Sequence, residues 1–196
     1  MIAFLRGQVF EKHPNRLVVD VAGVGYDVQV PLSTFYTAGE PGTEIALRIH
    51  THVREDQLSL YGFATPLELT MFERLIAVSG IGPKLALSVL SGIETRDLVG
   101  AILRNDLARL TAIPGVGKKT AERMCVELRD RMPKAVATGA VPSPGDALRD
   151  DLVSALSNLG YHRQAIDKSL DRLVSDASEP RFEDVLRSAL KDLSRA

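Results

Sequence analysis

The chain carries the stretch VSGIGPKLA at residues 78–86 and the stretch IPGVGKKTA at residues 113–121. Both have the order apolar residue, any residue, glycine, apolar residue, glycine, and then two residues that include lysine. Each pattern predicts a tight turn between two helices, the helix-hairpin-helix motif, which holds a nucleic-acid backbone. The apolar residue between the glycines (Ile81 or Val116) is expected to plug the turn into a core.

The residue types suit contact with a phosphate. Glycine reaches positive φ and has no side chain, so the chain turns tightly and approaches an anion closely. The helix that follows begins with unpaired N–H groups, and its dipole favours an anion. Such contacts hold the backbone and read no base sequence. The candidate DNA-binding residues are Gly80, Gly82, Lys84, Gly115, Gly117, Lys118, Lys119 and Arg123.

A single Gly-x-Gly is usually just a turn, but the flanks of these two also repeat. An alignment of residues 75–90 with 110–125 leaves leucine, alanine, both glycines, a lysine and a second alanine identical. Other phosphate loops do not fit. A Walker A loop would need glycine where Ala112 stands, and a dinucleotide fingerprint would need glycine at Leu85 or Thr120. The sequence therefore predicts no built-in ATP or NAD site and no cofactor.

Charge is unevenly distributed along the chain, whose net charge is −1. Residues 63–132 carry ten Lys/Arg against eight Asp/Glu, whereas residues 1–62 carry five against seven and residues 133–196 nine against ten. Affinity for DNA must then come from local placement of charge. The chain lacks Trp and has 5% aromatic residues, which argues against an aromatic platform for single strands.

The sequence offers little for disulfide, metal or membrane chemistry. Cys125 is the one cysteine, which excludes an internal disulfide and a cysteine-rich zinc site and predicts a half-buried core residue. Arg6 interrupts the first apolar stretch, so no signal peptide is expected. No apolar run approaches the roughly 20 residues of a membrane span. We expect a cytoplasmic protein that does not enter a membrane.

The chain divides into segments of different character, which predicts an α+β multidomain fold. Residues 1–63 read as five short strands, at 2–5, 17–21, 26–31, 44–53 and 58–63, and predict a small closed barrel of the OB-fold type. Residues 64–132 read as helices that include both hairpins. Thr65, Pro66 and Glu68 form a capping-box pattern, and Thr95 is expected to cap the helix over 95–103.

The last third of the chain is predicted to contain a linker and a small helical domain. Residues 133–146 are rich in proline, glycine and small residues, and predict a flexible connection. Residues 147–196 read as three short helices, with a break at Leu159-Gly160-Tyr161 that is typical of UBA-like domains. At about fifty residues this unit lies near the lower limit of independent stability.

Two carboxylates, Glu55 and Asp56, are predicted at the tip of the hairpin that joins the last two strands. By themselves they indicate a solvated turn. Adjacent carboxylates also suggest metal-dependent catalysis, but the nearest additional ligands are His50 and His52, which are more often ordinary sheet residues. In a protein that holds DNA, exposed negative charge repels phosphate and steers strands away from itself.

These features occur in an order that resembles the RuvA family of Holliday-junction recognition subunits, over essentially the whole chain. The most specific stretches are GVGY (23–26), VRED (53–56), LYGF (60–63), GPKLAL (82–87) and PGVGKKTAER (114–123). The resemblance implies a homotetramer that holds an open four-way DNA junction, with two tetramers on one junction as a further possibility. It implies that Glu55 and Asp56 form an acidic pin at the centre that helps to separate strands.

The resemblance also implies partners and a process. The three-helix domain would dock on the hexameric ATPase RuvB, which would carry out all ATP hydrolysis for branch migration, and the junction resolvase RuvC would act on the same complex. These roles belong to DNA recombination, DNA repair and the SOS response. The residues expected to contact the ATPase are Leu156, Leu159, Tyr161 and Leu190.

Three functions therefore remain in competition. The first is a non-enzymatic scaffold that binds junctions and recruits a motor. The second is a structure-specific nuclease that uses Glu55, Asp56 and a metal ion, which the absence of further ligand motifs disfavours. The third is a general duplex-binding module, which has no use for acidic residues at a barrel tip.

Overall fold

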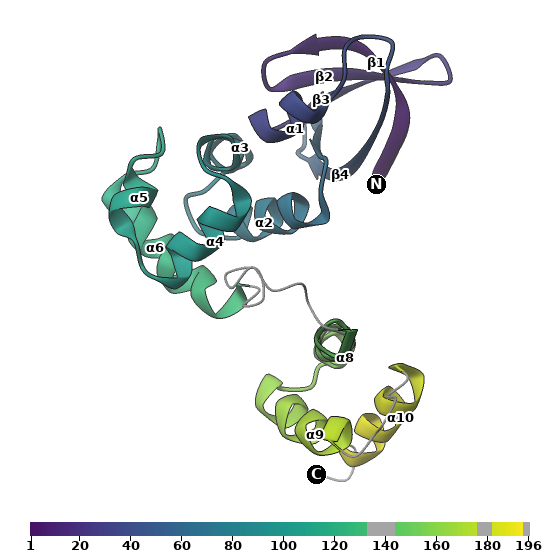
Figure 1. Cartoon of the computed structure of the whole chain (residues 1–196), viewed down its shortest axis with the longest axis vertical. Helices are drawn as coiled ribbons and strands as arrows, with labels where there is room; N and C mark the ends of the chain where they lie inside the picture. Colours follow the sequence, from purple (N-terminus) through teal and green to yellow (C-terminus); the bar gives the residue numbers. More distant parts are fainter. Residues whose placement is uncertain (133–143, 176–181, 194–196) are drawn as a thin grey trace. The chain divides into compact units, whose positions relative to one another are not determined.

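The computed structural model describes residues 1–132, 144–175 and 182–193 of the chain. The chain forms two compact units, Met1–Thr138 and Gly139–Ala196. Figure 1 shows the strands of the first unit at one end of that unit and its helices packed beside them. The expected combination of a barrel with helical segments is confirmed.

The barrel closes in the order β1-β2-β3-β5-β4. Its strands are β1 (Phe4–His13), β2 (Arg16–Val21), β3 (Val24–Gln29), β4 (Glu44–Val53) and β5 (Leu58–Phe63). Neighbours are antiparallel except β3 and β5, which pair in parallel. Alternate residues point inward and form an apolar core that includes Leu17, Val19, Val28 and Leu47. The predicted ranges 44–53 and 58–63 match β4 and β5, whereas the predicted first strand, 2–5, overlaps β1 only at Phe4 and Leu5.

A short helix, α1 (Leu32–Thr37), connects β3 to β4 and was not predicted. Six residues give too little helical periodicity to stand out in a sequence. Its Thr34 side chain is fully buried and accepts a hydrogen bond from the Ala64 amide at 3.0 Å. The helix therefore ties the barrel to the segment that leaves β5.

The helical part of the first unit contains α2 (Pro66–Ile76), α3 (Pro83–Gly92), α4 (Thr95–Leu103), α5 (Leu107–Thr111), α6 (Lys118–Leu128) and a 3₁₀ turn (Arg129–Arg131). The predicted capping box at Thr65 and Glu68 is present. The prediction that Thr95 caps α4 is wrong, because Glu94 is the N-cap residue and Thr95 lies buried in the first turn. Helix α5 is the helix expected before the second hairpin, whose bounds the sequence did not predict; the Asp106 side chain caps it.

A second apolar core, separate from that inside the barrel, joins strand β5 to the helices and is called the shared core below. Phe72 of α2 packs against Phe63 and Tyr61 of β5, with ring centroids 4.9 and 5.0 Å apart. The buried carboxylate of Glu68 accepts hydrogen bonds from the Ser33 hydroxyl of α1 and from the Thr65 amide at 3.0 Å. This contact region fixes the first helical hairpin relative to the barrel.

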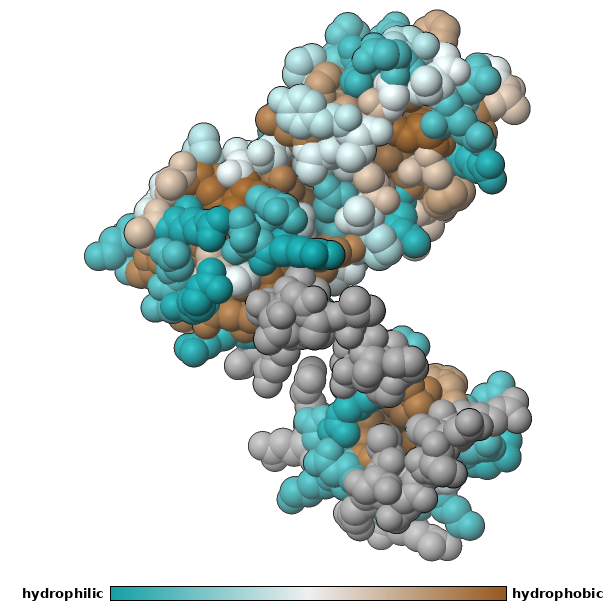
Figure 2. All heavy atoms as spheres, in the orientation of Figure 1, coloured by the Kyte–Doolittle hydropathy of each residue, from teal (hydrophilic) through white to brown (hydrophobic). Residues whose placement is uncertain are grey.

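The second unit contains α8 (Pro144–Asn158), α9 (Arg163–Ser175) and α10 (Phe182–Leu193), which confirms the three helices predicted there. Their shared core is made by Leu152, Leu156, Ile166, Leu170, Val185 and Ala189. Figure 2 shows apolar residues of this unit next to hydrophilic ones on the face that it presents. Helix α8 begins at Pro144, whereas the linker was expected to extend to residue 146; residues 133–143 lie outside the described residues.

Candidate nucleic-acid interface

The first hairpin joins α2 to α3 and turns at Gly80, whose φ is +88°. The Val78 amide donates to the Leu75 carbonyl at 3.0 Å, and the Ile81 amide donates to the Val78 carbonyl at 3.0 Å. Ile81 is buried in the shared core, as the sequence predicted. Two interactions therefore fix the turn: burial of the Ile81 side chain in the core and the hydrogen bonds of the turn's own backbone.

The second hairpin joins α5 to α6 and repeats this geometry 35 residues later. Gly115 has φ +87°, the Ile113 amide donates to the Leu110 carbonyl at 3.2 Å, and the Val116 amide donates to the Ile113 carbonyl at 3.0 Å. Val116 is buried in the same core. The repeat in the sequence is thus a repeat in backbone conformation.

The second glycine of each hairpin could be replaced by a larger residue without a clash inside the protein. Gly82 and Gly117 are the N-cap residues of α3 and α6, with φ of −87° and −82°, which any residue adopts. A Cβ atom built on either would meet no heavy atom within 4 Å. Folding therefore does not require glycine at these positions, whereas close approach of an outside group does.

Lysine occurs in the first turn of each helix that follows a hairpin. Lys84, Lys118 and Lys119 are all exposed, and among the described residues none of the three pairs with a carboxylate within 4.0 Å. Neither N-cap residue supplies a side-chain hydrogen bond to the helix that it starts. Unpaired N–H groups, the helix dipole and free ammonium groups together favour a phosphate at each hairpin.

Arg123 has a contact that sequence reasoning missed. Its Nη1 atom donates to the Ser79 carbonyl at 2.7 Å, so α6 of the second motif holds the turn of the first. The equivalent position of α3, 35 residues earlier, is Ser88, whose hydroxyl donates to the Pro114 carbonyl at 3.1 Å. The two motifs therefore contact each other reciprocally through equivalent positions. Arg123 remains half-exposed and keeps further donors for a ligand.

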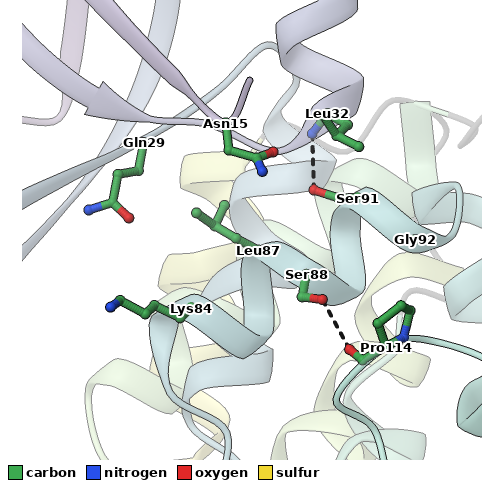
Figure 3. A pocket seen from close by; sticks show the side chains of 9 residues that line it. All are labelled: Asn15, Gln29, Leu32, Lys84, Leu87, Ser88, Ser91, Gly92 and Pro114. Atoms are coloured by element: carbon green, nitrogen blue, oxygen red, sulfur yellow. Dashed lines mark hydrogen bonds between the residues drawn. The ribbon is translucent and has the colours of Figure 1, made fainter. Parts of the chain in front are cut away.

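Helix α3 is anchored at two points along one side (Figure 3). Ser88 contacts the second hairpin, and the Ser91 hydroxyl accepts a hydrogen bond from the Leu32 amide at 3.0 Å, at the start of α1. A hollow of about 450 Å³ lies between this helix, the barrel and Pro114. The barrel thereby sets the spacing between the hairpins and the β4–β5 tip.

The predicted acidic tip is present between β4 and β5. The Arg54 amide donates to the Gln57 carbonyl at 2.8 Å and closes the turn, which leaves Glu55 and Asp56 exposed. Below it, Val53 and Leu58 form a cross-strand pair with both side chains more than half exposed. The tip therefore presents two carboxylates above an apolar stem.

The two histidines of β4 have different surroundings. His50 Nδ1 lies 3.3 Å from the Glu73 carboxylate of α2, and its ring packs on Phe72 with centroids 5.3 Å apart. Arg54 Nε donates to His52 Nε2 at 3.2 Å. Within the described residues, no group of three or more His, Cys, Asp and Glu side chains is placed to hold a metal ion.

The four residues expected to contact an ATPase are not equally accessible. Leu156 is fully buried in the core of the second unit, so it supports that core and offers no surface, which corrects the expectation. Leu159 is 61% exposed, while Tyr161 and Leu190 are partly buried and pack against the core. The accessible part of the expected face therefore centres on Leu159.

Cys125 of α6 is buried in the shared core, deeper than the half-buried position expected. Burial raises the pKa of its thiol above the ordinary value. None of the described helices is long and apolar enough to cross a membrane.

Comparison with known proteins gives matches over nearly the whole chain. Residues 1–62 match the family described as RuvA N terminal domain, residues 72–130 match the SAM-like helix-hairpin-helix tandem, and residues 147–194 match RuvA, C-terminal domain. A protein of Geotalea daltonii named Holliday junction branch migration complex subunit RuvA is 48% identical, with 100% of each chain covered. Proteins of the same name from Solibacter usitatus (48% identical; 97% of this chain and 98% of the relative) and Geobacter sulfurreducens (46%; 100% of each) are also similar.

Proposed function

This chain belongs to the RuvA family, and we propose that it recognises four-way (Holliday) DNA junctions without sequence preference, as the DNA-binding subunit of a branch-migration complex. The observation that carries the proposal is the pair of matched hairpins, in which Gly82 and Gly117 are open to an outside group and lysines lie alongside. Two equivalent anion sites on one rigid core suit the two strands of one duplex arm.

The acidic tip supplies the preference for a junction. Glu55 and Asp56 are exposed on the barrel, whose position relative to the hairpins is fixed by the shared core. Phosphates drawn to the hairpins are repelled at the tip, so a duplex that continues straight past it is disfavoured. At a four-way junction the strands diverge, which leaves room for the carboxylates between them.

The finer roles follow the same family. The protein acts as a homotetramer, with one or two tetramers on each junction. It works in the cytoplasm, holds the junction open for the hexameric ATPase RuvB and shares it with the resolvase RuvC. ATP hydrolysis belongs to the partner. The second unit docks on RuvB through the face around Leu159, together with Tyr161 and Leu190.

A competition gel shift at near-physiological salt, without ATP, tests the junction proposal. A labelled four-way junction is challenged with excess linear duplex of matched sequence, with and without Mg²⁺. We expect binding to survive the duplex and the DNA to stay uncut. Equal competition by duplex would favour a general duplex-binding module, and Mg²⁺-dependent cleavage would favour a nuclease.

The docking proposal needs a separate measurement. Leu159→Asp places a charge on the exposed part of the face and leaves the buried core of the second unit unchanged. We expect this variant to bind the junction like the unmodified protein and to stimulate the ATPase poorly. Full stimulation would remove Leu159 from the docking face.

A further inference from the structure

A hollow of about 390 Å³ lies beside the acidic tip, between the barrel and the start of α3. Strand β4 and the tip contribute His52, Arg54 and Gln57, and the first hairpin contributes Gly82 and Lys84. Its volume is near the lower end of the range for sites that enclose a small ligand, about 300–1,000 Å³. This hollow, called the tip cavity, has room for one small ligand of about the size of a nucleotide, and not for several linked units.

The lining of the tip cavity favours an anion. Arg54 and Lys84 carry positive charge, and among the described residues that line the cavity there is no carboxylate. Glu55 and Asp56, the next residues after Arg54, are exposed on the tip itself. A phosphate at this end of the barrel is therefore repelled by the tip and attracted into the cavity beside it.

The remaining polar groups of the cavity suit a nucleobase. The amides of Gln29 and Gln57 and the hydroxyl of Ser59 each offer both donors and acceptors, so they fit the edge of any base. The half-buried His52 ring offers a face for stacking, and Tyr61 supports it edge-on with centroids 6.3 Å apart. Unpaired bases are commonly held by stacking on rings of this kind.

The cavity also lies on a route from the hairpins. Gln29 and Lys84 line both the tip cavity and the neighbouring hollow drawn in Figure 3, which extends to Pro114 of the second hairpin. Because Lys84 of the first hairpin lines the tip cavity itself, a strand held at that hairpin lies next to the cavity.

We propose that the tip cavity holds one unpaired nucleotide of a strand that has left its duplex at the tip. Arg54 and Lys84 bind its phosphate, and His52 stacks on its base. The hydrogen bond from Arg54 Nε to His52 Nε2 holds the guanidinium beside the ring. This assignment rests on the proposed junction-binding function and adds to it a subsite for a single nucleotide.

A double-substitution cycle on the full-length protein tests the subsite. An immobile four-way junction is prepared intact or with one crossover nucleotide made abasic, and its affinity is measured for each variant. We expect the abasic change to weaken binding by unmodified protein about fivefold or more, as loss of one base–aromatic stack does. His52→Leu should weaken binding to the intact junction similarly and make the protein insensitive to the abasic change.

Matched variants separate the base from the phosphate. His50→Leu removes the same side chain from the same strand; the His50 ring stacks on His52 with centroids 6.4 Å apart but does not line the cavity, so the abasic penalty should remain. His52→Gln keeps an acceptor for Arg54 without a ring, so it should lose the abasic penalty and keep the salt dependence of binding. Arg54→Ala should flatten the slope of log K against log salt by about one unit.

Several outcomes would overturn the assignment. The first is an abasic change that weakens binding equally in His52→Leu and in the unmodified protein. The second is an abasic change that does not weaken binding by the unmodified protein. The third is an Arg54→Ala variant whose slope of log K against log salt is unchanged. Each variant is accepted only if its thermal melting is unchanged. Preference of the unmodified protein for junction over duplex is measured in the same assay. Its loss would overturn the proposed function, whereas its retention with any of these results would overturn the nucleotide subsite alone.

Discussion

Replacement of Gly117 by alanine should distinguish the requirements of folding from those of DNA binding. A Cβ there meets nothing within 4 Å, and φ of −82° suits alanine. The substitution lowers the conformational entropy of the unfolded chain, which stabilises the protein by about 0.4–1 kcal/mol. It also replaces a better N-cap residue by a poorer one, at a cost of roughly 0.5–1 kcal/mol. These effects oppose each other, so we expect the free energy of unfolding to change by about 0.5 kcal/mol or less.

Binding of DNA should respond quite differently. The added methyl group stands at the N-terminus of α6, where a phosphate would accept hydrogen bonds from backbone N–H groups. A hydrogen bond to a charged group contributes about 1.5–3 kcal/mol. Loss of one such bond weakens junction binding by roughly 10- to 150-fold. Gly82→Ala should behave in the same way, because its surroundings are equally open.

Gly23→Ala provides the matched control. Its Cβ would also meet open space, but φ is +87° and the residue lies in the β2–β3 turn. Left-handed backbone costs an alanine about 1–2 kcal/mol, so this variant should unfold more readily and bind the junction normally. Urea unfolding and gel shifts on all three variants provide the comparison. Gly117→Ala that binds like unmodified protein, or that unfolds as easily as Gly23→Ala, would refute the reasoning.

Three further changes test other parts of the site. Lys119→Ala should weaken binding to all DNA sequences alike and flatten the slope of log K against log salt by about one unit; an unchanged slope would mean that Lys119 touches no phosphate. Glu55→Lys combined with Asp56→Lys should keep or raise affinity but abolish the preference for junction over duplex in gel shifts, and a retained preference would contradict the pin role. Burial raises the pKa of Cys125, so its contribution to stability is complete below the ordinary thiol pKa, about 8.5, and is lost as pH rises through the folded value. Urea unfolding between pH 7 and 10 should therefore show a decline that Cys125→Ala reduces, and parallel curves would disprove it.

Most of the fold was predictable because its signals are local. Alternation of apolar residues predicted β4 and β5 over their full lengths, and Thr65 with Glu68 predicted the start of α2. Helix α1 and the bounds of α5 were not predicted because six and five residues carry little periodicity. Thr95 has the side chain of a good N-cap residue, but tertiary packing buries it one position inside the helix.

The site was predictable only in part. Glycines and lysines at fixed spacing predict a hairpin, and both hairpins have the expected turns. The tip cavity was not predictable, since strands β3, β4 and β5 and helix α3 meet there only in the folded chain. The same holds for Leu156, whose helical spacing is compatible with either the core or the surface, and whose burial is decided by α9 and α10.

The reciprocal contacts between the motifs should make the paired hairpins better anion sites than a single hairpin. The carbonyl of Ser79 is engaged by Arg123, and that of Pro114 by Ser88. Both carbonyls lie in the turns, where a free oxygen would repel a phosphate. Each motif therefore uses a donor from its helix to occupy an acceptor in the other motif's turn. The N–H groups in the first turns of α3, after Pro83, and of α6 keep no such internal partner from an N-cap side chain. When the two motifs pair, each turn loses an exposed carbonyl acceptor and keeps its exposed N–H donors. A single helix-hairpin-helix motif has no second motif to supply the donor that occupies the carbonyl.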